Sequence, residues 1–248
     1  MMIPGHSLIF AHRGANREAA ENSRSAFDRA LDYAIDGIET DVQLSRDGVA
    51  VLWHDDRLGK LGLPDKQIDD FDYAQLRAMN LAAHFLPGGK AESIMTLEAF
   101  LAAYRQRCRL LIEIKNPASE PASRHQAKVR QTLALIGQDA SILVSSFDQA
   151  SLVYAHQQRP DAPLVCNFEP DQTLADAQHV LTGQPFLHGL CLPIATLDEA
   201  MVRLLRSKGK SIAVYTCNSD AEIGKALALG VDILISDVPQ HALAMRDK

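Results

Sequence analysis

The chain has 248 residues, of which 47% are hydrophobic and 23% are charged, and its formal net charge is -6 at pH 7. This length suits one large α/β domain. The acidic balance argues against a nucleic-acid surface, which needs clustered Lys and Arg, and no segment approaches the run of about 20 apolar residues that spans a membrane. We therefore expect a single domain over residues 1–248 that is soluble, cytoplasmic and without a stable membrane anchor.

The N-terminal part of the chain alternates between strand and helix. Residues 8–11 form an apolar run that predicts a buried strand. From about Asn22, small and apolar side chains recur every three or four residues, as on one face of an amphipathic helix. A second strand is expected over Gly37 to Leu44. These segments predict a first βα unit and the strand that follows it.

A hairpin and an insertion are expected after the second strand. The dipeptide Asp47-Gly48 separates that strand from the run Val49 to Trp53, and Asp-Gly between two strand-like runs indicates a hairpin. Residues 57–95 carry several glycines and prolines in no regular pattern. We expect them to form a small insertion after strand 2 with one short helix near residues 73–79.

From Thr96 to the C-terminus, helix-like and strand-like segments alternate regularly. Thr196 with Glu199, and Ser219 with Glu222, have the spacing of capping boxes, which indicates two helix starts. Helices are expected near residues 96–105, 123–136, 148–158, 172–181 and 197–207, and strands over 109–115, 141–145, 163–167, 187–192, 211–215 and 232–236, the last strand lying between two helices.

Eight strand-like segments, each followed by a helical pattern, predict an α/β fold of the TIM (β/α)8 barrel type with a small insertion. A doubly wound open sheet is disfavoured because no G-x-G-x-x-G follows the first strand. The pair Gly89-Lys90 does not complete a P-loop, since His84 stands where that motif needs glycine. The four cysteines are dispersed without a C-x-x-C pair, which favours buried free thiols over a zinc or redox site.

Acidic residues gather where two of these strands end. Glu39 and Asp41 are two residues apart in a strand and therefore point to the same side, and Glu113 interrupts a later apolar run. Neighbouring carboxylates repel each other unless a cation lies between them. We expect these three residues to bind Ca²⁺ or Mg²⁺. The alternatives are a solvated strand edge at Glu39 and Asp41 and a structural ion pair of Glu113 with Lys115.

Two histidines and two basic residues accompany the carboxylates. His12 and Arg13 end the first strand, Lys115 ends the third, and His54 follows the extra run. Because active sites of such barrels lie at the carboxyl ends of the strands, we expect these residues at one rim. His12 and His54 suit an acid and a base for displacement at phosphorus, and Arg13 and Lys115 suit an anionic group. Each has a structural alternative, a core histidine or a rim salt bridge, but their convergence favours a site.

The order and spacing of these residues resemble those of the glycerophosphodiester phosphodiesterase family over nearly the whole chain. The resemblance implies a TIM barrel that hydrolyses small-molecule glycerophosphodiesters to sn-glycerol 3-phosphate and an alcohol with a divalent cation. The motifs that carry it are His12-Arg13-Gly14, Glu21-Asn22-Ser23, Glu39-x-Asp41-Val42, Asp47-Gly48 before His54-Asp55, Glu113-Ile114-Lys115, Ser145-Ser146-Phe147, Tyr215-Thr216-Cys217-Asn218 and Ser236-Asp237-x-Pro239.

By matching position, the resemblance implies the roles already inferred for the carboxylates, histidines and basic residues, and adds Glu21 and Asn22 as supporting residues. The sequence departs from the family in two places. The insertion lacks the threonine-rich and G-S-W stretches that are usual in relatives. Tyr215 stands where a tryptophan is common, so we expect a phenol rather than an indole at the substrate-binding wall.

Two other functions compete with this one. A lysophospholipase D-type activity on the same scaffold needs an apolar surface near the mouth, for which Phe85-Leu86-Pro87 is a hint. A barrel that binds a phosphorylated ligand without turnover is disfavoured, because a binding module has no need of a paired acid and base. The sequence predicts neither the alcohol, the preferred cation, the oligomeric state nor which histidine acts first.

Overall fold

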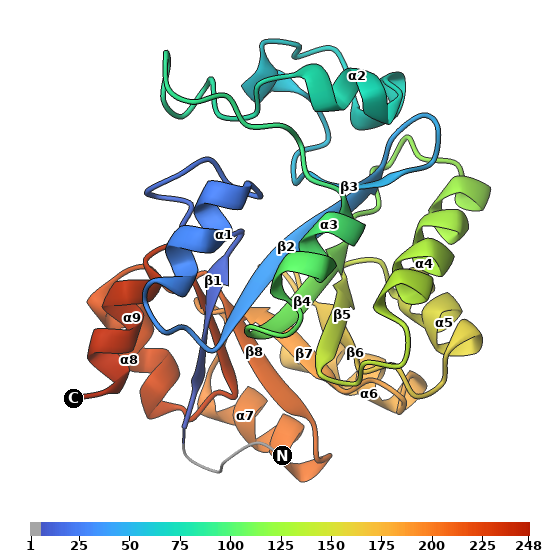
Figure 1. Ribbon diagram of the computed structural model, residues 1–248. Helices are drawn as coiled ribbons and strands as arrows, with labels where there is room; N and C mark the ends of the chain where they lie inside the picture. The colour runs from blue at the N-terminus through green and yellow to red at the C-terminus, as the bar shows by residue number, and fades with distance from the viewer. Residues whose placement is uncertain (1–5) are drawn as a thin grey trace.

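The computed structural model describes residues 6–248 and has the architecture of a TIM barrel (Figure 1). Within these residues, eight parallel strands follow one another around the barrel, which closes where β1 pairs with both β9 and β2. This arrangement confirms the predicted (β/α)8 fold. The parallel strands are β1 (Leu8–His12), β2 (Gly37–Leu44), β4 (Arg109–Ile114), β5 (Ile142–Ser146), β6 (Leu164–Asn167), β7 (Gly189–Pro193), β8 (Ser211–Tyr215) and β9 (Ile233–Ser236).

The hairpin expected after the second strand is present. Strand β3 (Ala50–Leu52) runs antiparallel to β2, with Val42 opposite Leu52. Gly48, in the turn between them, has a φ of 80°, a left-handed conformation that glycine adopts without steric cost. The Asp-Gly signal in the sequence therefore corresponds to a turn that requires its glycine.

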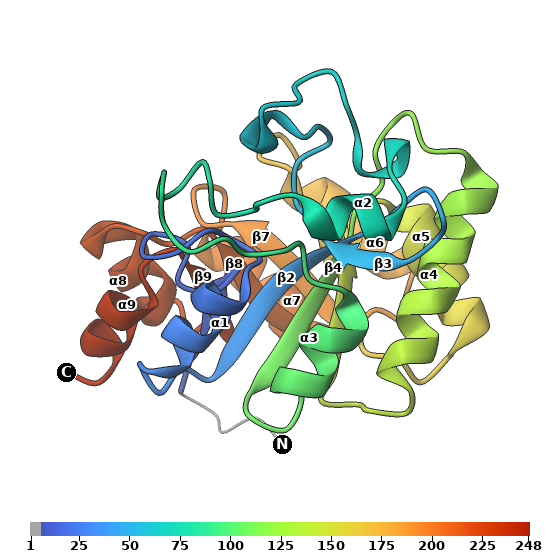
Figure 2. The same ribbon diagram turned by 45° about the horizontal axis from the view of Figure 1, so that its top comes forward.

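Helices cover the outside of the barrel (Figures 1 and 2). No helix within residues 6–248 is both long enough and apolar enough to cross a membrane. The helices are α1 (Arg24–Leu31), α2 (Tyr73–Ala78), α3 (Leu97–Tyr104), α4 (Ala122–Ile136), α5 (Gln149–Gln158), α6 (Leu174–Gly183), α7 (Glu199–Ser207), α8 (Asp220–Ala228) and α9 (Pro239–Arg246).

One of the two predicted capping boxes is confirmed and the other is wrong. Ser219 caps α8, and its side chain and that of Glu222 make the reciprocal bonds of a capping box. Helix α7 is instead capped by Asp198, whose Oδ1 accepts from the backbone N–H of Met201 at 2.8 Å. The hydroxyl of Thr196 donates to a backbone carbonyl, that of Pro193. Aspartate caps a helix at least as well as threonine, so the helix begins two residues later than the pattern indicated.

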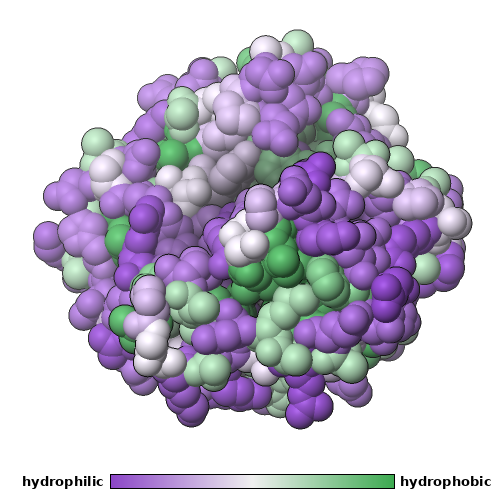
Figure 3. Space-filling model, turned by 90° about the horizontal axis from the view of Figure 1, so that it is seen from above, coloured by the Kyte–Doolittle hydropathy of each residue, from purple (hydrophilic) through white to green (hydrophobic). Residues whose placement is uncertain are grey.

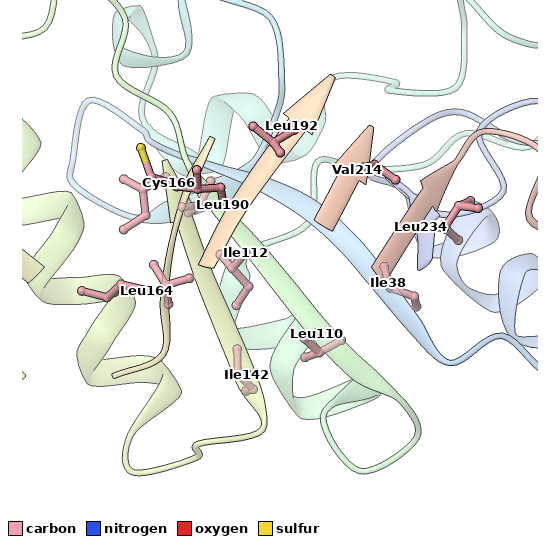
Figure 4. Packing of buried hydrophobic residues seen from close by; sticks show 14 of the residues in the cluster. Ile38, Leu110, Ile112, Ile142, Leu164, Cys166, Leu190, Leu192, Val214 and Leu234 are labelled. Atoms are coloured by element: carbon pink, nitrogen blue, oxygen red, sulfur yellow. The ribbon is translucent and has the colours of Figure 1, made fainter. Parts of the chain in front are cut away.

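Apolar side chains fill both sides of the barrel wall. Those that point outward, such as Ile112 and Leu190, form the layer between the strands and the helices (Figure 4). Those that point inward include Phe10 and Leu111 and form a second cluster inside the barrel. A Cβ at Gly37 would lie 2.4 Å from the Phe10 ring, so glycine at this position allows that ring to fill the interior. This filling leaves the polar residues at the carboxyl ends of the strands.

Residues 57–95 lie over the carboxyl end of the barrel, at the top of Figure 1. They contain two short 3-10 helices, η1 (Gly59–Leu61) and η2 (Ile68–Asp70), and α2. Trp53, Leu58 and Leu76 belong to an apolar cluster that is separate from the barrel core. The segment therefore has a small core of its own and borders the barrel mouth.

Candidate active site at the barrel mouth

Strand register brings the three predicted metal ligands together. Glu39 and Asp41 point into the barrel from β2, and Asp41 stands beside Glu113 in the pairing of β2 with β4. One oxygen of each carboxylate lies within 4.8 Å of the other two. All three residues are at least nine-tenths buried, which is costly for carboxylates without compensating charge. They form a compact acidic group, named here the carboxylate triad.

The carboxylate triad holds more negative charge than its surroundings balance. Burial, and then the charge of Asp41, raise the pKa of both Glu39 and Glu113. Burial also opposes ionisation of Asp41, but Arg13 and the other nearby cations outweigh it and lower the pKa of Asp41 to about 2. The Oδ1 atom of Asp41 is buried without a hydrogen-bond partner among residues 6–248. The triad thus offers unsatisfied oxygen acceptors to a cation.

The two basic residues predicted to face an anionic group pair with carboxylates in this structure. The Nζ atom of Lys115 lies 2.8 Å from Oε1 of Glu113 and 4.0 Å from Oδ1 of Asp41. The guanidinium of Arg13 lies 3.2 Å from Oδ2 of Asp41 and 3.1 Å from Oε2 of Glu21. Both side chains also line cavities at the mouth. They are therefore held in place by acidic partners while they face the space above the triad.

The two predicted catalytic histidines lie on the same cavity, and each is held by an aspartate. The Nδ1 atom of His12 is 2.6 Å from Oδ1 of Asp237, and that of His54 is 2.8 Å from Oδ1 of Asp55. This use of Nδ1 leaves the Nε2 atoms for other contacts, and Nε2 of His12 is 3.9 Å from Glu39. Burial lowers the pKa of His12, although the hydrogen bond with Asp237 opposes that shift. Each histidine thus has the carboxylate partner that fixes an imidazole in one orientation.

The two predicted supporting residues contact the site from the loop after β1. The side-chain N–H of Asn22 donates to Oδ2 of Asp41 at 3.0 Å, and Asn22 accepts from the hydroxyl of Thr40. Glu21 accepts from Arg13 and from Lys60 at 2.7 Å. Arg13 and Asn22 both adopt positive φ values, 56° and 55°, which cost about 1–3 kcal/mol each. Such local strain is common where a site dictates the backbone conformation.

The cavity above the triad has a charged wall and a neutral wall. It has a volume of about 160 Å³, and a larger outer cavity of about 560 Å³ adjoins it through His54, Glu113 and Tyr215. The neutral wall of the inner cavity includes Ser145 and Asn167. Figure 3 looks onto this end of the molecule, where hydrophilic side chains and a hydrophobic patch meet near the centre. The two cavities together can hold a substrate with two organic arms.

Sequence reasoning did not assign a site role to Asn167 or Asp237. Asn167 ends β6, donates to Oε2 of Glu113 at 3.2 Å, and has a buried Oδ1 without a partner among residues 6–248. Asp237 follows β9, holds His12 and accepts from Asn218 at 2.8 Å. Both lie at the carboxyl ends of strands. The same strand-end rule that selected Glu113 would have found them in the second half of the barrel.

Two further histidines contact carboxylates away from the cavity above the triad. His125 is buried, and its Nδ1 lies 2.9 Å from Oε2 of Glu120. It belongs to a polar cluster between α4 and α5, and it does not line the cavity above the triad. His241, on α9, pairs with Asp220 at the surface.

Comparisons with known proteins agree on one family. Residues 12–241 match the Glycerophosphoryl diester phosphodiesterase family. A glycerophosphodiester phosphodiesterase of Bacillus altitudinis is 30% identical over 251 residues, which cover 97% of this chain and 98% of the relative. A glycerophosphodiester phosphodiesterase of Bacillus subtilis is 25% identical over 96% of this chain and 86% of its own length.

Solved structures share the fold. A phosphodiesterase of Oleispira antarctica, in complex with the product sn-glycerol-3-phosphate, has a TM-score of 0.87 and 24% identity, with 98% of each chain covered. A glycerophosphodiester phosphodiesterase from Parabacteroides distasonis has a TM-score of 0.81 and 20% identity, with 99% of this chain and 98% of that chain covered. The family match spans nearly all of the sequence and includes the strand ends that carry the candidate site. This chain belongs to the glycerophosphoryl diester phosphodiesterase family.

Proposed function

We propose that the protein hydrolyses glycerophosphodiesters to sn-glycerol 3-phosphate and an alcohol. The observation that carries the proposal is the convergence of two aspartate-held histidines and the carboxylate triad on one cavity at the barrel mouth. Family membership supports the reaction class, as does the name of the Bacillus altitudinis relative. The complex of the Oleispira antarctica enzyme with sn-glycerol-3-phosphate supports the product.

We propose that a divalent cation takes part in the reaction, and the carboxylate triad suits one. Its oxygen donors are those that Ca²⁺ and Mg²⁺ prefer. The Oδ1 atom of Asp41, which accepts no hydrogen bond from residues 6–248, and the raised pKa of Glu39 both favour a positive charge between the two carboxylates. Glu39, Asp41 and Glu113 would hold the ion. A bound divalent cation would polarise a phosphoryl oxygen and stabilise the negative charge that develops there.

The two histidines divide the proton transfers. One accepts a proton from the attacking hydroxyl or water, and the other donates a proton to the oxygen of the leaving alcohol. Asp237 and Asp55 keep the imidazoles oriented during these steps. Arg13 and Lys115 contribute positive charge beside the phosphate, while Glu21 and Asn22 position Arg13 and Asp41. Tyr215 contributes the aromatic wall of the substrate pocket.

The deciding experiment measures release of sn-glycerol 3-phosphate from glycerophosphocholine and glycerophosphoethanolamine. The reaction is run with Ca²⁺, with Mg²⁺ and with a chelator. We expect release that depends on one of the cations and stops with the chelator. If sn-glycerol 3-phosphate is released as fast with the chelator as with a cation, the role of the metal is contradicted. If it is released from no glycerophosphodiester, the reaction itself is contradicted.

A second candidate activity is cleavage of a lysophospholipid in the manner of a lysophospholipase D. We propose that residues 1–248 form one domain in which 57–95 are an insertion over the barrel mouth. Two apolar side chains of that insertion are exposed, Phe85 by 38% and Leu86 by 61%. Exposed apolar side chains at a site mouth favour contact with an acyl chain. Head-group release from a lysolipid, measured beside the water-soluble diester, tests this activity. Leu86→Ser should then reduce only the lysolipid reaction.

A further inference from the structure

The outer cavity has acidic side chains at its rim. Asp56 and Glu169 line it, both are exposed, and neither carboxylate has a hydrogen bond or ion pair with another residue of the described range 6–248. Asp148 lines it too, and its carboxylate accepts from the backbone N–H of Ser151 at 2.9 Å. Two free carboxylates therefore face a space that adjoins the reacting centre.

Aromatic rings form another part of the same wall. Phe147 and Tyr215 line the outer cavity, and their rings meet edge to face with centroids 6.0 Å apart. The Nζ atom of Lys115 lies 5.9 Å from the centroid of Phe147, within the range of a cation–π contact. The Phe147 ring thus already contacts one cation, Lys115, in this structure. The negative charge of Glu169 also contributes to the raised pKa of Tyr215, after burial, which agrees with its carboxylate being near the phenol.

The charge of the outer cavity is negative overall. Lys115 is the only Lys or Arg among the described residues that line it, and its Nζ is paired with Glu113 at 2.8 Å. Asp56 and Glu169, further out, have no such partner. An anionic or neutral group gains nothing from this rim, whereas a cation gains attraction from the carboxylates and from the aromatic face.

The two cavities differ in their lining and in their size, and these differences match the two arms of the substrate. The inner cavity is small, about 160 Å³, and carries neutral hydrogen-bonding groups such as Ser145 and the partnerless Oδ1 of Asn167. These suit the hydroxyls of the glycerol arm, which is the same in every substrate. The outer cavity, about 560 Å³, then takes the alcohol that varies.

We propose that the outer cavity is a subsite for a positively charged alcohol, so that the enzyme prefers glycerophosphodiesters of an amino or quaternary ammonium alcohol. The inference rests on the proposed function. A diester of this class carries one negative charge on phosphorus and one positive charge on the alcohol. Its two ends match the basic residues above the triad and the acidic rim respectively. A diester with an uncharged or anionic alcohol lacks the second match.

The test compares kcat/KM for glycerophosphocholine with kcat/KM for glycerophosphoglycerol, whose alcohol is uncharged. The ratio is informative because effects on the chemical step cancel in it. We expect the wild type to prefer the choline diester, and Asp56→Asn and Glu169→Gln each to lower the ratio about two- to fivefold, as expected for partly exposed charge pairs. Phe147→Leu should lower it by a similar factor. Added salt should also reduce the preference of the wild type for the choline diester, because it screens the charges of the rim.

A matched control is Asp161→Asn, since Asp161 is an exposed acidic residue in the loop between α5 and β6, at the opposite end of the barrel. It should leave the ratio unchanged. A wild-type ratio at or below one, or ratios in Asp56→Asn and Glu169→Gln equal to that of the control, would overturn the subsite. Hydrolysis of no diester at all would overturn the proposed function and the subsite with it, so the two failures are distinguishable.

Discussion

Two buried ionisable clusters of this chain use similar residues but balance charge differently. The α4 cluster consists of Glu120, His125 and Lys128 and lies at and before the start of α4, outside the barrel. Oε2 of Glu120 meets Nζ of Lys128 at 2.8 Å and Nδ1 of His125 at 2.9 Å. Burial opposes ionisation of Glu120, but these hydrogen bonds and charges outweigh it and lower its pKa. Burial lowers the pKa of Lys128, although Glu120 opposes that shift. The carboxylate of Glu120 thus contacts both basic side chains of the α4 cluster.

The carboxylate triad is the opposite case. Two of its members, Glu39 and Glu113, have raised pKa values, and in the third, Asp41, the Oδ1 atom accepts no hydrogen bond from residues 6–248. The triad faces the inner cavity. Glu120 and His125 of the α4 cluster also line a cavity, of about 260 Å³, but there Glu120 is already paired with both His125 and Lys128. In both clusters a carboxylate lies beside a lysine, so composition alone does not separate them. A paired cluster stabilises the fold, and an unbalanced cluster that faces a cavity is prepared for a ligand.

The largest expected effect that separates the two clusters is on turnover. His12→Gln should lower kcat about 10²–10⁴-fold, because it removes one of the two proton-transfer groups while Gln preserves much of the shape. Steady-state kinetics of sn-glycerol 3-phosphate release measure the effect. Thermal unfolding of the variant should remain cooperative.

The matched control is His125→Gln in the α4 cluster. It should leave kcat within a few-fold of the wild type, since His125 does not line the inner cavity, and should instead lower stability. Equal losses of kcat in His12→Gln and His125→Gln would remove the distinction between the clusters.

Lys128→Met should cause the largest loss of stability, about 3 kcal/mol of unfolding free energy, because it leaves Glu120 buried beside one partner fewer. Nζ of Lys128 also donates to the backbone carbonyl of Lys115 at 2.5 Å, so the end of β4 loses a contact. Chemical denaturation measures the change. Adding Glu120→Gln to this variant should recover part of the loss, and strict additivity of the two changes would contradict the pairing.

The sequence was sufficient to predict those elements whose structure depends on local patterns. The strand Gly37–Leu44 has the predicted ends, because a buried parallel strand reads as a continuous run of residues that fit a sheet. Helix α1 begins at Arg24 rather than near Asn22, because Asn22 adopts a positive φ and Ser23 caps the helix. Such backbone detail depends on the site around Asp41, which a helical periodicity does not contain.

Contacts between residues that are far apart in the sequence could not be predicted from local patterns. His12 and Asp237 are 225 positions apart and meet only because the last strand closes the barrel against the first. The α4 cluster was missed for a related reason, since Lys128 is a residue type that normally lies on the surface of a helix. Its burial follows from Glu120 and the carbonyl of Lys115, both brought to it by the fold.

Metal addition and removal should affect the triad and not the α4 cluster. A divalent cation at 100 times its Kd should raise the unfolding free energy by about 2.7 kcal/mol, and a chelator should remove that gain. Glu39→Gln should lose most of the gain and weaken cation binding in calorimetry. In chelator the same variant should be at least as stable as the wild type, because burial and the charge of Asp41 disfavour the ionised Glu39.

Glu120→Gln is the control for that experiment. It removes a carboxylate that is fully paired, so it should lower stability equally with cation and with chelator. A cation-dependent stability change in Glu120→Gln, or an unchanged cation affinity in Glu39→Gln, would contradict the assignment of the triad as the metal site.

The smallest expected effect is the pH dependence of the His12–Asp237 pair, which sits at the triad but is balanced like the α4 cluster. Burial opposes ionisation of Asp237, yet hydrogen bonds with His12 and Asn16 outweigh it and hold its pKa well below the usual range. A carboxylate with a depressed folded-state pKa stabilises the fold above its unfolded pKa, about 3.9, and loses that contribution as pH falls further. Asp237→Asn should therefore lower the unfolding free energy by about 1–2 kcal/mol at pH 7.

Denaturation experiments at different pH values test this. The difference in unfolding free energy between wild type and Asp237→Asn should shrink as the pH is lowered below about 4, because protonation removes from the wild type the charge that the variant already lacks. A difference that stays constant from pH 7 down to the acid limit would mean that Asp237 acts through shape alone. In that case His12 would be held by packing rather than by charge, and the likeness of this pair to the α4 cluster would fail.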